Sequence, residues 1–207
     1  RDFGMFEKTS LEMIEASGGK PLLPRKWTEL SAMTISYGHG LSTSPLHLAA
    51  GYAALANGGY QVTPTLIRKE QPTLGPRIIS ESAAKASVVM LRKVVTQGTA
   101  KRYGDVPGYA VAGKTGTSEK LKKNGGGYDK ERVLASFASV FPAHDPQYVL
   151  VVAMDEAVET VGLKPRRTAS LTAVPVAAEI IGRVAPLLGM RPHFEPQVLT
   201  NVELTAN

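Results

Sequence analysis

Residues 109–117 read Tyr-Ala-Val-Ala-Gly-Lys-Thr-Gly-Thr, an apolar run that ends in a dense polar cluster. Such a run predicts a β-strand, and two longer strands are predicted downstream at Val133–Val140 and Tyr148–Met154. A tight turn at residues 142–146 joins the last two strands, so this part of the sheet is expected to be antiparallel. The polar cluster is therefore predicted to lie on the first strand of an antiparallel sheet.

Helices are predicted on either side of these strands in the sequence. The pair Ser44-Pro45 is typical of a helix start, and Asn57-Gly58-Gly59 ends that helix. Either Ser80 or Ser82 begins a second, amphipathic helix, and an alanine-rich helix is predicted from about Thr168 to Leu188. The predicted fold class is therefore α+β, an antiparallel sheet flanked by helices.

Other segments carry weaker signals. Residues 1–40 alternate short apolar pieces with glycines and prolines and are expected to be irregular. Tyr60–Arg68 alternates weakly and predicts a possible strand, whereas Ser118–Lys130 is lysine- and glycine-rich and is expected to form a solvated, mobile loop. We assign residues 1–190 to one domain and residues 191–207 to a loosely held tail.

Composition narrows the classes of function. The 207 residues carry a formal net charge of +6, and 43 % of them are hydrophobic, as in an ordinary globular domain. The basic excess fits either a solvated surface or an anionic partner. Aromatic residues make up 6 % and do not alternate with basic runs, so no nucleic-acid partner is expected. The chain has no cysteine, which excludes disulfides and thiol catalysis.

Metal, cofactor and membrane signals are also missing from the sequence. The four histidines (His39, His47, His144 and His193) are not spaced as a metal-binding set, and we expect neither a metal nor another cofactor. No segment reaches the roughly 18 consecutive apolar residues that a membrane-spanning helix needs.

The cluster Lys114-Thr115-Gly116-Thr117 has a chemistry of its own. Lys114 supplies a positive charge, and the hydroxyls of Thr115 and Thr117 point to the same side of a strand. Gly116 has no side chain, so a ligand backbone is able to approach closely, and the N–H groups of the strand are suited to an extended peptide or an oxyanion. The alternative interpretation of the tetrapeptide is a polar turn at a strand end.

Two further patterns compete for the functional assignment. Gly108–Thr115 fits the nucleotide-binding pattern G-x-x-x-x-G-K-[ST], although turn residues precede it and no helix is predicted after it, as a P-loop requires. The pattern S-x-x-K, in which a helical lysine activates a serine, occurs at Ser17–Lys20 and at Ser82–Lys85. Pro21 follows the first and rules out a stable helical turn, whereas Ser82 lies on a predicted helix.

Nearly the whole chain resembles the penicillin-binding proteins, especially the monofunctional transpeptidases of septal division and elongation. The resemblance rests on four segments in a fixed order: Tyr37-Gly38-His39-Gly40-Leu41 with Ser44–Ala49, Asn57-Gly58-Gly59, Gly98-Thr99-Ala100 with Gly108–Thr117, and Ser136–Pro142 with Asp145-Pro146. It implies the second half of the serine acyl-transferase domain shared with β-lactamases, in which a five-stranded antiparallel sheet lies between helical layers.

The family carries three motifs in the order S-x-x-K, S-x-N and K-T-G, and this chain shows the third alone. The resemblance implies that the nucleophilic serine is not in this chain and lies upstream of Arg1, in keeping with a start at Arg1-Asp2-Phe3-Gly4 instead of methionine. Ser82 lies after the place expected for S-x-N, so the resemblance argues against it as a nucleophile. By itself this fragment is expected to be inactive.

For the intact protein the resemblance implies a peptidoglycan D,D-transpeptidase that cross-links stem peptides through an acyl-serine intermediate and binds penicillin. Lys114 and Thr117 take catalytic roles, the first in proton transfer and the second through a backbone N–H in the oxyanion hole. Thr115, Gly116 and Thr117 are the expected substrate-binding residues, with the two threonine hydroxyls on the terminal carboxylate. Pro165–Ser170 stands where the family has a glycine-rich segment, and no role is assigned to it.

The resemblance also implies partners and a location. Expected partners are the stem peptide, β-lactams, the missing N-terminal half of the same protein and membrane proteins of the division complex. The expected place is the periplasmic face of the bacterial inner membrane, with the anchor in the missing part. Two alternatives stay open: a P-loop nucleotide-binding module at Gly108–Thr115, and a non-catalytic peptidoglycan-binding module that uses the same strand.

Overall fold

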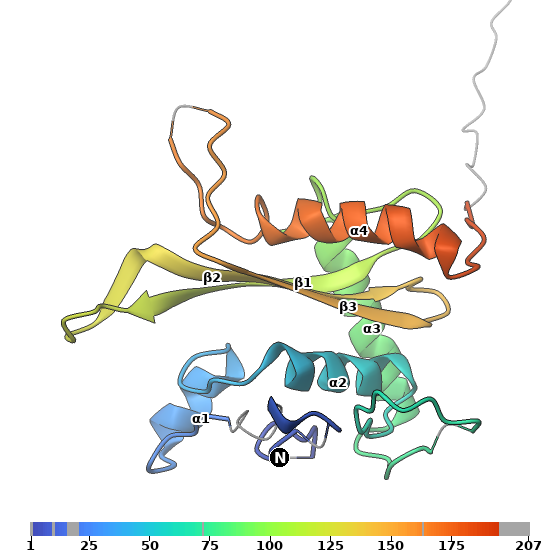
Figure 1. Ribbon diagram of the computed structural model, residues 1–207, viewed down its shortest axis with the longest axis horizontal. Coiled ribbons are helices and arrows are strands. Elements are labelled where there is room, and N and C mark those ends of the chain that lie inside the picture. The colour runs from blue at the N-terminus through green and yellow to red at the C-terminus, as the bar shows by residue number, and fades with distance from the viewer. Residues whose placement is uncertain (1, 10, 16–20, 72, 163, 195–207) are drawn as a thin grey trace, which may run out of the picture.

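The computed structural model describes residues 2–9, 11–15, 21–71, 73–162 and 164–194. Its helices and strands follow in chain order: α1 (Glu29–Ser36), α2 (Pro45–Ala56), α3 (Glu81–Thr96), β1 (Ala112–Leu121), β2 (Tyr128–Phe141), β3 (Tyr148–Asp155) and α4 (Ala173–Leu187). The three strands form one antiparallel sheet in the order β1-β2-β3 (Figure 1). The predicted α+β class and antiparallel pairing are confirmed.

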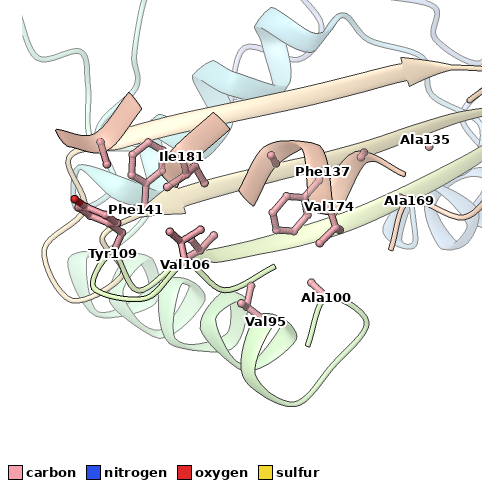
Figure 2. Close-up of a cluster of buried hydrophobic side chains, with 14 residues drawn as sticks. Val95, Ala100, Val106, Tyr109, Ala135, Phe137, Phe141, Ala169, Val174 and Ile181 are labelled. Atoms are coloured by element: carbon pink, nitrogen blue, oxygen red, sulfur yellow. The ribbon is translucent and has the colours of Figure 1, made fainter. Parts of the chain in front are cut away.

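Helices cover both faces of the sheet. Figure 1 shows α4 along one face and α2 along the other, with α3 running from the α2 side toward the α4 side. The face toward α4 holds the main core, which Figure 2 shows in close-up. Phe137 of β2 lies beside Val174 of α4, whereas Ile181 of α4 lies nearer Phe141, and Phe137, Val174 and Ile181 are fully buried (Figure 2). Ala173, Ala177 and Ala185 present small side chains, so α4 packs closely on the strands.

Helix starts follow the predicted capping chemistry. Ser44 Oγ accepts a hydrogen bond from the His47 N–H, and Pro45 occupies the first helical position of α2. The choice between Ser80 and Ser82 is resolved in favour of Ser80, whose Oγ accepts from the Ala83 N–H at 3.2 Å. Each hydroxyl satisfies a backbone donor that a helix start otherwise leaves unpaired.

Two predictions for the first 70 residues are wrong. Residues 29–36 were expected to be irregular but form α1, which Thr28 caps. None of the residues of α1 is buried, so the sequence lacks the amphipathic pattern from which such a helix is predicted. Tyr60–Arg68 is not a strand, since pairing is limited to an isolated bridge between Tyr60 and Arg77. Pro64 in the middle of this segment lacks the N–H that a ladder needs.

The predicted loop at Ser118–Lys130 is also wrong, because most of it is a β-hairpin. β1 continues to Leu121 and β2 begins at Tyr128, with a register shift between Glu119 and Lys120. Gly125, Gly126 and Gly127 all have positive φ, and this conformation reverses the chain where most residues would be strained. Lys120 forms ion pairs with Asp155 and Glu156, which fasten the hairpin to the end of β3.

The ends of the last helix differ from the predicted ones. α4 begins at Ala173 instead of Thr168, because residues 168–172 form turns in which the Thr172 hydroxyl donates to the Thr168 carbonyl. After α4 the chain turns back onto the body, and the His193 N–H donates to the Gly108 carbonyl at 2.8 Å. The predicted tail therefore includes four residues, 191–194, that the structure places, whereas 195–207 lie outside the described residues.

Candidate functional site

The polar cluster lies in the middle of an edge strand. β1 pairs with β2 on one side, and no strand of the described part of the chain pairs with its other side. Lys114, Thr115 and Thr117 are opposite Ala138, Phe137 and Ala135 of β2. An unpaired strand edge presents a row of free N–H and C=O groups, which is a template for an extended peptide.

The two threonines lie on the same face of the sheet, as predicted. Their β2 partners, Phe137 and Ala135, belong to the core under α4, so both hydroxyls are on the α4 side. Thr115 Oγ1 lies 2.8 Å from Thr99 Oγ1, and Thr117 Oγ1 accepts from the Ala169 N–H at 3.1 Å. Since a hydroxyl both accepts and donates, the Thr117 proton stays available to a ligand.

Lys114 reaches the same edge from the other side. Strand alternation places its side chain on the opposite face from Thr115 and Thr117, and its Nζ donates to the Thr115 carbonyl at 2.9 Å. The side chain is exposed. This edge strand therefore carries a cation on one face and two hydroxyl groups on the other, with the Lys114 amine held at the backbone of Thr115 between them.

Gly116 is required by the neighbouring strand as well. A Cβ atom at this position would lie 2.6 Å from Ser136 Oγ, closer than side-chain carbons approach other atoms. The Ser136 hydroxyl also lies 3.5 Å from the Gly116 carbonyl. The glycine thus lets β1 and β2 pack together, a reason additional to the ligand approach that the sequence suggested.

Thr99 was not among the predicted site residues, although its segment contributed to the resemblance. It lies in the turn after α3, where buried Ala100 fixes the backbone through an N–H that donates to the Val94 carbonyl. Its hydroxyl holds that of Thr115 at the strand edge. Sequence spacing gave no signal for this pair, because 16 residues separate the two threonines.

An ion pair fixes the segment that leads into β1. Arg92 donates to both carboxylate oxygens of Asp105, at 2.7 and 2.9 Å, and to the Val111 carbonyl at 2.8 Å. Asp105 Oδ1 in turn accepts from the N–H groups of Val106 and Val111. These bonds hold Val111, the residue directly before β1, and so set the position at which the chain enters the strand at Ala112.

The competing motifs lack the geometry that their chemistry needs. Lys114 and Thr115 lie inside β1, which continues to Leu121, so no helix begins at the lysine of the P-loop pattern. Lys85 pairs with Glu81 at 2.6 Å instead of with Ser82, whose hydroxyl lies beside Ser80 Oγ. The pattern at 17–20 lies outside the described residues.

No metal centre is found among the residues that the structure describes, in the sense of three or more histidine, cysteine or acidic side chains grouped together. His47 is buried and lies between Ser44 Oγ and the Glu7 carbonyl, which identifies it as a packing residue. Two clefts of about 320 and 250 Å³ lie away from the cluster, the first beside Asp105 and His193 and the second beside His47. The candidate site is an open strand edge.

The family model of the penicillin binding protein transpeptidase domain matches residues 1–182. The chain belongs to the penicillin-binding protein transpeptidase family. It is 34 % identical to the probable peptidoglycan D,D-transpeptidase FtsI of Caulobacter vibrioides over 97 % of its length. It is 28 % identical to FtsI of Escherichia coli K12 over 96 %.

Solved structures of this family share the fold. The transpeptidase domain of penicillin-binding protein 3 from Burkholderia pseudomallei superposes with a TM-score of 0.81 at 32 % identity, over 94 % of this chain and 57 % of that one. Penicillin-binding protein 3 of Mycobacterium tuberculosis, solved in complex with ampicillin, gives a TM-score of 0.79 at 28 % identity, over 95 % of this chain and 46 % of that one.

The chain spans about a third of the length of the curated transpeptidases it matches, 35 % of the Caulobacter protein and 32 % of the Escherichia coli protein. No helix within the described ranges has the length and apolar character needed to cross a bilayer.

Proposed function

We propose that this chain is the substrate-binding side of a peptidoglycan D,D-transpeptidase that acts in septal division and binds penicillin. The observation that carries the proposal is the open edge of β1, where the Lys114 amine lies at the Thr115 carbonyl and where Thr99 and Ala169 hold the hydroxyls of Thr115 and Thr117. The names of the related proteins support the same reaction and the division role.

In the proposed reaction, a serine outside residues 1–207 attacks the carbonyl of the penultimate D-alanine of a stem peptide. The C–N bond to the terminal D-alanine breaks, and that residue leaves as a free amine. An amine of a neighbouring stem peptide then attacks the acyl-serine and forms the cross-link. A β-lactam ring opens on the same serine and stays attached.

The residues of this chain bind and polarise the substrate. The hydroxyls of Thr115 and Thr117 and the charge of Lys114 bind the terminal carboxylate, and Gly116 keeps the strand free of a side chain beside it. The Thr117 N–H donates to the oxyanion that develops on the attacked carbonyl, and Lys114 supports proton transfer.

The proposal includes the context of the longer protein. The side chains of Leu30, Met33 and Tyr37 in and next to α1 are 69 %, 60 % and 73 % exposed. Because large exposed apolar surfaces usually meet a partner, the proposed N-terminal half of the longer protein would cover this surface. Division-complex membrane proteins are further proposed partners, and the periplasmic face of the inner membrane is the proposed location. This chain alone would be inactive.

The experiment is the rate of acylation of the longer protein by a fluorescent penicillin. Thr117→Val keeps the shape of the side chain but removes the hydroxyl, and we expect the second-order rate to fall about 10- to 100-fold, the value of a hydrogen bond to a charged group. Ser118→Ala is the control, because Ser118 is exposed and follows on the opposite face.

Thermal unfolding of both variants separates binding from stability, since Thr117→Val also leaves the Ala169 N–H without its acceptor. Equal acylation rates for wild type and Thr117→Val, with equal melting temperatures, would remove the hydroxyl from the proposed site.

A further inference from the structure

The connection between β3 and α4 returns to the candidate site. It leaves the end of β3 as a long excursion on the α4 side of the sheet (Figure 1). Its last part is fixed, because Ala169 is buried in the main core and its N–H donates to Thr117 Oγ1. Arg167 lies two residues before this contact, so its Cα is within about 7 Å of the Cα of Ala169.

Arg167 is a partly buried cation without a partner in the described part of the chain. Its Nε is buried and makes no hydrogen bond, and none of its donors is paired with a residue that the structure describes. Its neighbour Arg166 differs, since Arg166 Nη2 donates to the Val161 carbonyl and its backbone pairs with Glu159. Lys164 of the same connection is exposed, whereas Arg167 is half-buried, so Arg167 is the partly buried cation of the described connection that is left to bind something else.

Partial burial of an unpaired guanidinium charge is unfavourable, and a carboxylate bound at the Nη groups would neutralise that charge, although the buried Nε would keep no acceptor. The planar guanidinium offers two parallel N–H groups that match the two oxygens of a carboxylate. Because the Nε side is packed, the side chain has already lost much of its freedom, and binding through the Nη groups costs less entropy.

Hydroxyl-bearing residues follow Arg167 in the chain. Thr168 and Ser170 flank the buried Ala169, and their hydroxyls lie 3.1 Å apart. Thr117 lies on the other side of the Ala169 contact. Hydroxyl groups that are able to donate to a carboxylate therefore lie within three residues of Arg167 in the chain and at the Ala169 contact.

We propose that Arg167 is a specificity-determining residue that binds a second carboxylate of the substrate, separate from the terminal carboxylate at Thr115 and Thr117. The preferred substrates are acidic peptides with a further carboxylate upstream of their C-terminus, or penicillins with a carboxylate on the acyl side chain. This inference rests on the proposed function, since it assigns the ligand to the same edge of β1.

The test compares two penicillins on the longer protein, one with a carboxylate on its acyl side chain and one in which that group is an amide. The ratio of their second-order acylation rates isolates the second carboxylate. Arg167→Gln is expected to lower this ratio about tenfold, as the loss of a charge-assisted hydrogen bond would. Arg167→Lys keeps the positive charge but loses the two parallel N–H donors of the guanidinium. Its ratio of rates is therefore expected to lie between those of wild type and Arg167→Gln.

Arg166→Gln is the matched control and is expected to keep the wild-type ratio, because the Arg166 guanidinium already donates to the Val161 carbonyl in the same connection. An unchanged ratio in Arg167→Gln overturns the inference and means that Arg167 serves the fold or a contact with the rest of the protein. Failure of the wild-type protein to react with either penicillin would instead overturn the proposed function, so the two failures are distinguishable.

Discussion

Atoms of β2 determine which residues β1 tolerates at the site. The hydroxyl of Ser136 occupies the space where a Cβ of Gly116 would lie. The same pairing places Thr115 and Thr117 over core residues, so the hydroxyls are held on one face. Packing inside the sheet thus restricts the residues that fit at positions 115–117, independently of any ligand.

Gly116→Ala is expected to lower the free energy of unfolding by about 1–3 kcal/mol, the usual cost of overpacking. Adding Ser136→Ala removes the clashing hydroxyl and should restore much of the loss, as urea unfolding of both variants would measure. Gly182→Ala in α4 is the control, since its nearest contact at 3.7 Å is ordinary and alanine favours a helix. A double variant no more stable than Gly116→Ala would contradict this packing account.

Glu156 links the hairpin to the end of β3 through its carboxylate. Hydrogen bonds from Lys120 and Arg132 lower its pKa below the ordinary value. A lowered carboxyl pKa stabilises the fold above the unfolded pKa of about 4.3, and this stabilisation disappears as the pH falls through the folded pKa.

Wild type is therefore expected to lose more stability than Glu156→Gln between pH 5 and pH 3. Thermal unfolding as a function of pH measures the difference. The difference should shrink in high salt, because the group is exposed and its ion pairs are screened. Parallel pH profiles for the two proteins at low salt would refute a role for this carboxylate.

Among helices and strands, those with local signals were predictable from the sequence. Ser44-Pro45 and the region of Ser80 gave the starts of α2 and α3, because a capping hydroxyl acts on the next few residues. β2 and β3 showed the apolar composition of buried strands. α1 was missed because it buries nothing, and the hairpin was missed because Lys120 pairs with the distant Asp155 and Glu156.

The candidate site also contains residues that the sequence indicated and residues that only the structure revealed. Lys114 to Thr117 were identified from their own sequence, whereas the residues that hold them come from far along the chain. Thr99 and Ala169 meet the two threonines across separations of 16 and 52 residues. No periodicity or spacing rule links such positions, so only the folded chain brings them together.

Ser80→Ala is expected to destabilise the protein by about 1 kcal/mol, the usual value of an N-cap hydroxyl. Ser82→Ala is the matched control, since Ser82 lies inside the first turn and is expected to change stability by less than about 0.5 kcal/mol. Urea unfolding compares the two. If Ser82→Ala is the more destabilising, the assigned start of α3 is wrong.

The described part of the molecule is a sheet with helices on both faces, and the candidate site lies on the outer edge of β1, which no described strand covers. It matches transpeptidases roughly three times its length, and the acyl-accepting serine is proposed to lie outside it. Residues 1–207 would then supply carboxylate binding and part of the oxyanion hole, while the covalent step would occur on another segment.

The site of penicillin attachment tests this division most directly. The longer protein is labelled with penicillin, digested, and the modified peptide is identified by mass spectrometry, with the 207-residue chain treated in parallel. The account predicts one adduct per molecule, on a serine outside residues 1–207, and no adduct on the chain alone. An adduct within residues 1–207, above all at Ser82, would contradict it.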